Sequence, residues 1–254
     1  MSHSHRTPAY SRTDLFHSRI AINNDLRGFR MKNATKTLIS FALLSLSPSL
    51  LASSYYYHER VYEVTVTNLT KGIAFTPVLG ATHLPRNQLF RLGEPVTDNV
   101  ERVAEGGDIG PLRAELDASS QYSATAASEG LLTNGQSVTF EITSQRPHSR
   151  ISLISMLLPT NDTMVSLRGK RLPRYIGTSV TYQMHAYDAG TEANDELCAN
   201  IPGPLCGGQP FSADAPTDEG YVYPSPGIHG EGDLAQSAYD WQGAVAKVRI
   251  KRIQ

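Results

Sequence analysis

The stretch Ile151-Ser152-Leu153-Ile154-Ser155-Met156-Leu157-Leu158 is an almost continuous apolar run. Such a run is typical of a central strand that is buried on both faces of a sheet. Other segments alternate between apolar and polar residues, which is the period of a strand with one buried face. These segments are residues 61–68, 136–143, 178–187 and 244–253. The pattern predicts an all-β fold built around residues 151–158.

One region departs from the strand period. Val100, Val103, Leu112 and Leu116 recur at helical spacing within residues 96–118. Two glycines at positions 106 and 107 divide this region, and glycine is a poor helix former. We therefore predict one or two short helices between the strands.

The N-terminal part of the chain does not resemble folded structure. Residues 1–30 are rich in His, Arg and Ser and are expected to be a disordered upstream extension, with Met31 as the start of translation. Residues 31–54 have a basic start, a short interrupted apolar run and small residues at the end, the pattern of a secretory signal peptide. The run is too short for a stable membrane span. The sequence thus predicts a secreted or periplasmic domain over residues 55–254.

Charge narrows the class of partner for this domain. Residues 1–54 hold seven of the 23 basic residues and two of the 24 acids, which leaves 16 basic residues against 22 acids. An acidic domain argues against nucleic acid or an anionic membrane surface as the partner, because both select a basic face.

The acids are concentrated in a segment that lacks basic residues. Residues 175–246 contain ten Asp or Glu and no Lys or Arg. These carboxylates must be spread over solvent, kept apart by the fold, or neutralised by a cation such as calcium, which prefers oxygen ligands. Asp162 follows the central strand and Asp188 ends another, so both could lie at one end of a sandwich. Which alternative holds stays open at this point.

The same segment contains both cysteines of the chain. Cys198 and Cys206 flank a short Pro- and Gly-containing stretch, and an exported chain meets an oxidising compartment, so we predict a local disulfide. Residues 198–241 form a connection longer than compact domains usually carry, which indicates a functional or a disordered loop. Five aromatic residues in this part of the chain favour a loop that is attached to the body of the domain.

Motifs for catalysis are mostly absent from the sequence. There is no nucleophile elbow, zinc-protease helix or phosphate-binding glycine loop. His185 and His229 lie among the acids, but a surface or hydrogen-bonded histidine is the better interpretation of each. We therefore expect a protein that is not an enzyme. The alternative is a periplasmic metal-dependent hydrolase that uses a bound ion or His229 to activate water.

Three sequence blocks resemble the spondin domain family in their order along the chain. They are Ser155-Met156-Leu157-Leu158-Pro159-Thr160-Asn161-Asp162, Tyr187-Asp188-Ala189-Gly190-Thr191-Glu192 and Tyr239-Asp240-Trp241 before the last strand. The resemblance extends over nearly all of residues 58–254. It implies an antiparallel β-sandwich of eight strands, here with a long acidic loop near the C-terminus.

The resemblance also implies a function. Spondin domains are secreted, carry calcium at one end of the sandwich and act in matrix or cell-surface adhesion. Residue by residue, it places metal-binding carboxylates at Asp162, Asp188 and Glu192, with a surface or matrix protein or glycan as the partner. This chain departs from the family in having Thr163 in place of a tryptophan, Glu192 in place of an aspartate, and an insert over residues 194–232.

Overall fold

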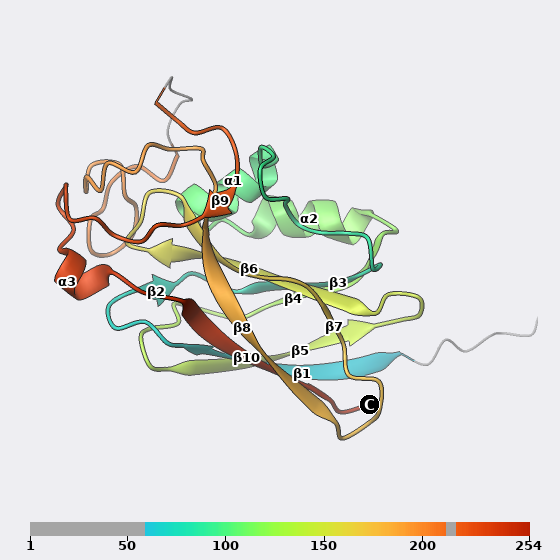
Figure 1. Ribbon diagram of the computed structural model, residues 1–254. Helices are drawn as coiled ribbons and strands as arrows, with labels where there is room; N and C mark the ends of the chain where they lie inside the picture. The colour runs from blue at the N-terminus through green and yellow to red at the C-terminus, as the bar shows by residue number, and fades with distance from the viewer. Residues whose placement is uncertain (1–58, 212–216) are drawn as a thin grey trace, which may run out of the picture. The chain divides into compact units, whose positions relative to one another are not determined.

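The computed structural model describes residues 59–211 and 217–254, and this part of the chain forms ten strands and three helices (Figure 1). The strands are β1 (Arg60–Asn68), β2 (Ala74–Phe75), β3 (Leu79–His83), β4 (Tyr122–Ala127), β5 (Ser137–Ser144), β6 (Arg150–Leu158), β7 (Thr163–Arg171), β8 (Ser179–Asp188), β9 (Tyr223–Pro224) and β10 (Ala244–Arg252). The helices are α1 (Asp98–Gly106), α2 (Gly110–Ala118) and α3 (Gln236–Tyr239).

Eight of the strands form one continuous antiparallel path. Their order is β4-β3-β6-β7-β8-β10-β1-β5, while the short strands β2 and β9 pair with β6 and β8. The two ends of the path approach each other, since the backbone N–H of Gln145, just after β5, donates to Ser123 Oγ of β4 at 2.9 Å. The sheet is therefore nearly closed, and the predicted antiparallel sandwich is confirmed.

Strand β6 is buried on both of its faces, as its apolar run predicted. Leu153 and Leu157 belong to the main core together with Tyr62 and Phe75. Ile154 points to the other side and belongs to a second core. All residues of β6 after the first are buried. The run lacks alternation because both sides of the strand are covered.

The two helices predicted within residues 96–118 are α1 and α2. Their apolar faces, which include Val100, Val103, Leu112 and Leu116, supply much of the second core. Figure 1 shows both helices on the same face of the sheet, where they cover β4 and β6. No helix in the described part of the chain is long and apolar enough to cross a membrane.

Several strands had no clear pattern in the sequence. Strand β3 reads Leu-Gly-Ala-Thr-His and β7 carries Ser166, Arg168 and Gly169, so neither shows a clean period of two. Both are placed in the sheet by their neighbours on either side. The predicted extension over residues 1–30 and signal peptide over residues 31–54 lie outside the described residues.

Candidate functional site

Strand pairing places Asp162 and Asp188 at the same end of the sheet. Thr163, the first residue of β7, is the register partner of Asp188, the last residue of β8. The backbone N–H of Ala189 also donates to the carbonyl of Asp162 at 3.3 Å. An antiparallel pair that joins the start of one strand to the end of the next brings the two flanking loops together. The two aspartates therefore belong to one loop cluster.

Asp162 is a fully buried carboxylate with one oxygen bound and one free. Its Oδ2 accepts backbone N–H groups from Thr191 at 2.8 Å and from Glu192 at 3.2 Å. Its Oδ1 is buried and has no hydrogen-bond partner among the residues that the structure describes. Burial and the nearby charge of Asp188 raise the pKa of Asp162 well above its usual value, although the two N–H donors oppose this. A buried acceptor without a donor is unfavourable unless a proton or a cation meets it.

Asp188 is buried as well, but both of its oxygens accept hydrogen bonds. Oδ1 accepts the N–H of Gly190 at 2.9 Å, and Oδ2 accepts the amide of Asn194 at 2.8 Å. Burial raises the pKa of Asp188, and the charge of Glu219 adds to this effect. Gly190 has a φ of 71°, and a Cβ there would lie 2.4 Å from the carbonyl oxygen of Tyr221. The tight turn after Asp188 therefore requires glycine.

Glu192 completes the set that the sequence predicted. Its side chain is buried, and its charge is one of the causes that raise the pKa of Asp162. Across residues 59–211 and 217–254, however, no group of three or more His, Cys, Asp or Glu side chains is already arranged to hold a metal ion. Both oxygens of Asp188 already accept hydrogen bonds, so a cation at Asp188 would compete with the Asn194 amide.

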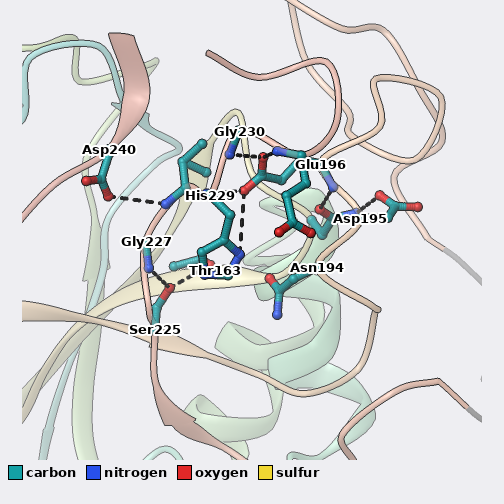
Figure 2. A network of polar contacts seen from close by, with 12 residues as sticks. Thr163, Asn194, Asp195, Glu196, Ser225, Gly227, His229, Gly230 and Asp240 are labelled. Carbon is teal, nitrogen blue, oxygen red and sulfur yellow. Dashed lines mark hydrogen bonds and ion pairs between the residues drawn. The ribbon is translucent and has the colours of Figure 1, made fainter. Parts of the chain in front are cut away.

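A fourth buried carboxylate, Glu196, lies nearby and was not among the predicted site residues. Glu196 accepts backbone N–H groups from His229 at 2.5 Å, Gly230 at 2.7 Å and Glu231 at 3.1 Å (Figure 2). Its own N–H donates to Asn161 Oδ1 at 3.2 Å, directly beside Asp162 in the chain. Glu196 thus joins the loop around residue 230 to the Asp162 loop. Its φ of 55°, unusual for a residue other than glycine, could not be read from the sequence.

Other acids of the segment are hydrogen-bond acceptors inside it. Asp195 accepts the side-chain amide of Asn161 at 3.0 Å, Asp233 accepts the N–H of Cys198 at 2.8 Å, and Asp240 accepts the N–H of Ile228 at 3.2 Å. Figure 2 shows Asp240, Glu196 and Asp195 spread across this network and not gathered at one point. These acids therefore need neither a metal ion nor a fully solvated loop to account for them.

The long segment after Asp188 is attached to the domain, as its aromatic residues suggested. Cys198 and Cys206 form the predicted disulfide, with an S–S distance of 2.05 Å. Ile201, Ile228 and Leu234 form a small core of their own, against which Tyr239 and Trp241 pack. Phe211 and Tyr221 lie further out, with 38% and 46% of their surfaces exposed.

His229 is the residue that a hydrolase would need here. Its ring is 45% exposed, and Nδ1 lies 4.0 Å from Glu196 Oε1. The shorter contact to Glu196 comes from the backbone N–H of His229 and not from the ring. The backbone contact attaches the loop around residue 230 to Glu196, and it offers no specific support for the hydrolase alternative.

The network around Glu196 leads to a prediction about stability. We expect Glu196→Gln to lower the free energy of unfolding by about 2 to 3 kcal/mol, because an amide offers one acceptor oxygen where the carboxylate offers two charged ones. Urea unfolding followed by tryptophan fluorescence measures the change. Glu231→Gln, which removes the same charge from an exposed side chain, is the matched control. Equal stability of the two variants would show that Glu196 does not hold the loop.

The fold and the strand-end carboxylates define a β-sandwich whose polar loops gather at one end, a design suited to a binding module. Residues 54–197 match the family model Spondin_N, and the chain belongs to this spondin N-terminal domain family. The predicted family is thereby confirmed, and the match includes the first two sequence blocks, while the block at residues 239–241 lies outside the matched range. Comparison with curated proteins gave no match. The matched range contains Asp162, Asp188 and Glu192 and ends directly before Cys198, so the disulfide loop lies beyond it.

Proposed function

We propose that this spondin domain is exported, binds one calcium ion through Asp162, Asp188 and Glu192, and acts in adhesion to a cell-surface or matrix component and not in catalysis. The observation that carries the proposal is the Oδ1 atom of Asp162, which is buried and has no hydrogen-bond partner in the described part of the chain. It lies beside two further buried carboxylates. Family membership supports an extracellular role.

Calcium suits this group of residues better than a softer metal. The three carboxylates offer only oxygen, and calcium takes about six to eight oxygen ligands, which backbone carbonyls and water can complete. Zinc and copper sites usually draw on Cys or His, and the nearest cysteines are joined in the disulfide. Neutralising the mutual repulsion of Asp162 and Asp188 would be the main energetic gain on binding.

A cavity beside the calcium residues is the surface on which we expect a partner to bind. Its volume is about 520 Å³, and its lining includes His185, Tyr187, Pro224 and Trp241. Tyr187 directly precedes Asp188, so an ion at the site would influence this wall of the cavity. Aromatic side chains that have a polar neighbour are common in protein recognition surfaces. The lining fits a glycan or a peptide segment of a surface or matrix protein.

Calorimetric titration tests the calcium proposal. Calcium chloride added to chelator-treated protein should give saturable binding of one ion per chain, and Asp162→Asn should abolish it. Asp108→Asn is the matched control, because it removes the same charge from an exposed side chain whose amide oxygen can still accept the N–H of Gly110. Absence of binding to the unmodified protein, or equal binding to the Asp162 variant, would overturn the proposal.

A further inference from the structure

Five arginines surround one cavity at the other end of the sheet. The cavity has a volume of about 400 Å³. The arginines that line it are Arg60, Arg146, Arg150, Arg171 and Arg174, and its remaining lining residues are Pro85, Pro147, Ser149 and Leu172. No acid is among them, and none of the ion pairs within the described residues includes one of the five arginines. This concentration of positive charge stands out in a domain whose net charge is negative.

Strand ends bring the arginines together. Arg60 begins β1, Arg150 begins β6 and Arg171 ends β7, while Arg146 and Arg174 lie in the adjoining turns. Each of β6 and β7 has nine residues, so the cavity lies roughly 25 Å from the Asp162 loop at about 3.3 Å per residue. Figure 1 shows these strand ends on the side of the sheet away from the irregular segment that follows β8.

The pairing of β6 with β7 sets two of the positive charges directly opposite each other. Arg150 is the register partner of Arg171, and like charges in opposite positions of a sheet destabilise it. Arg150 also has His83 as its partner on the other side, and after burial its charge is a main cause that lowers the pKa of His83. The sheet therefore concentrates positive charge here, and no ion pair among residues 59–211 and 217–254 compensates it.

Hydrogen-bond donors of the arginines are available to a ligand. Nε of Arg60 is buried and has no hydrogen-bond partner among the residues described, although another nitrogen of Arg60 donates to the carbonyl of His148 at 2.9 Å. Arg174 is positioned by its backbone, since its carbonyl accepts a guanidinium N–H of Arg252. A buried donor beside positive charge favours the binding of an anion, which can both accept the hydrogen bond and offset the charge.

We propose that this cavity binds a small ligand that carries phosphate groups. The planar guanidinium donates two parallel hydrogen bonds to phosphate oxygens, and phosphate brings up to two negative charges near neutral pH. Several arginines around one cavity thus match a ligand with more than one phosphate charge. The volume of about 400 Å³ lies within the range of small-ligand sites. The site shares no residue with the proposed calcium site.

Titration with inorganic pyrophosphate tests the proposal. Calcium-free protein in a buffer without phosphate or sulfate should bind pyrophosphate saturably, and Arg150→Gln/Arg171→Gln should bind it at least about tenfold more weakly, since each hydrogen bond to a charged group contributes that much or more. Arg91→Gln/Arg113→Gln removes the same two charges from exposed arginines that pair with Glu94 and Asp117, and it should bind like the unmodified protein.

Two further variants distinguish loss of pyrophosphate binding from misfolding and from loss of the calcium site. If Arg150→Gln/Arg171→Gln does not fold, Arg171→Gln/Arg174→Gln replaces it, because both of these side chains are exposed. Asp162→Asn should leave pyrophosphate binding unchanged, which separates this site from the calcium proposal. No binding by the unmodified protein, or equal affinity of the cavity variant and the Arg91/Arg113 control, would overturn the inference.

Vesicles identify the source of the phosphate. If the ligand is a lipid headgroup, the protein should sediment with phosphatidylcholine vesicles that contain phosphatidic acid and not with pure phosphatidylcholine, and the cavity variant should lose this difference. If the ligand is a free phosphorylated molecule, pyrophosphate should bind while neither kind of vesicle sediments the protein. Both results support the phosphate site, whereas sedimentation of the cavity variant equal to that of the unmodified protein would contradict a lipid ligand at the arginines.

Discussion

Asp162→Asn is expected to make the calcium-free protein more stable, by about 1 to 3 kcal/mol of unfolding free energy, the range for a buried polar atom that lacks its hydrogen bond. The amide oxygen can keep the N–H groups of Thr191 and Glu192, and the new NH₂ group can donate to a neighbouring carboxylate, whereas the partnerless Oδ1 can only accept. The substitution also removes a charge that Asp188 repels. Urea unfolding in the presence of a chelator at neutral pH measures the difference.

Calcium should reverse this order of stability. Binding to the folded state alone stabilises the unmodified protein by about 4.1 kcal/mol when free calcium is about 1,000 times the dissociation constant, which exceeds the expected gain of the variant. Asp162→Asn should gain nothing from the ion, and Asp108→Asn should follow the unmodified protein in both conditions. An Asp162→Asn variant that is less stable than the unmodified protein in chelator would show that the carboxylate is fully compensated without a cation.

The stability of the calcium-free protein should fall as the pH rises above about 4. Burial raises the pKa of Asp162 well above its ordinary value of 3.8, and burial also raises the pKa of Asp188. Between the ordinary value and the raised values the folded state holds more protons than the unfolded state, so the free energy of unfolding decreases with pH in that window. Each unit of difference in pKa corresponds to about 1.4 kcal/mol.

Calcium should give the opposite dependence, because the ion binds carboxylates only when they have lost their protons. Its stabilisation is therefore small in acid and grows as the pH rises through the raised pKa values. Unfolding curves from pH 4.5 to pH 8, with chelator-treated protein and with added calcium, separate the two slopes. Asp162→Asn should flatten the calcium-free curve. A calcium-free protein whose stability rises steadily with pH over this range would rule out raised pKa values at the site.

Much of the fold could be predicted because the order of apolar and polar residues in several strands matches which faces of those strands are buried. Strand β6 has an almost continuous apolar run since it separates two cores, and β1 and β10 alternate since only one face of each is buried. Strands β3 and β7 were missed because their burial comes from neighbours on both sides and from the helices, and no local period records those contacts.

The residues of the candidate site could also be predicted only in part. Asp162 and Asp188 could be placed together because a strand end can be recognised in sequence, and the antiparallel pairing of β7 with β8 then joins them. Glu196 was missed because its partners lie 33 to 35 residues further along the chain. The arginine cavity depends on the registers of several strands at once. Arg171 could not be placed there from the sequence, because β7, which it ends, was among the strands that were missed.

The anomalous difference density of a crystal soaked in calcium would show directly whether the three carboxylates bind the ion. We expect a single peak enclosed by the carboxylates of Asp162, Asp188 and Glu192, with oxygens at about 2.3 to 2.6 Å. The Asn194 amide should then have moved away from Asp188. A peak elsewhere, or a fully ordered Asp162 loop that shows no ion at a calcium concentration well above saturation, would contradict the account.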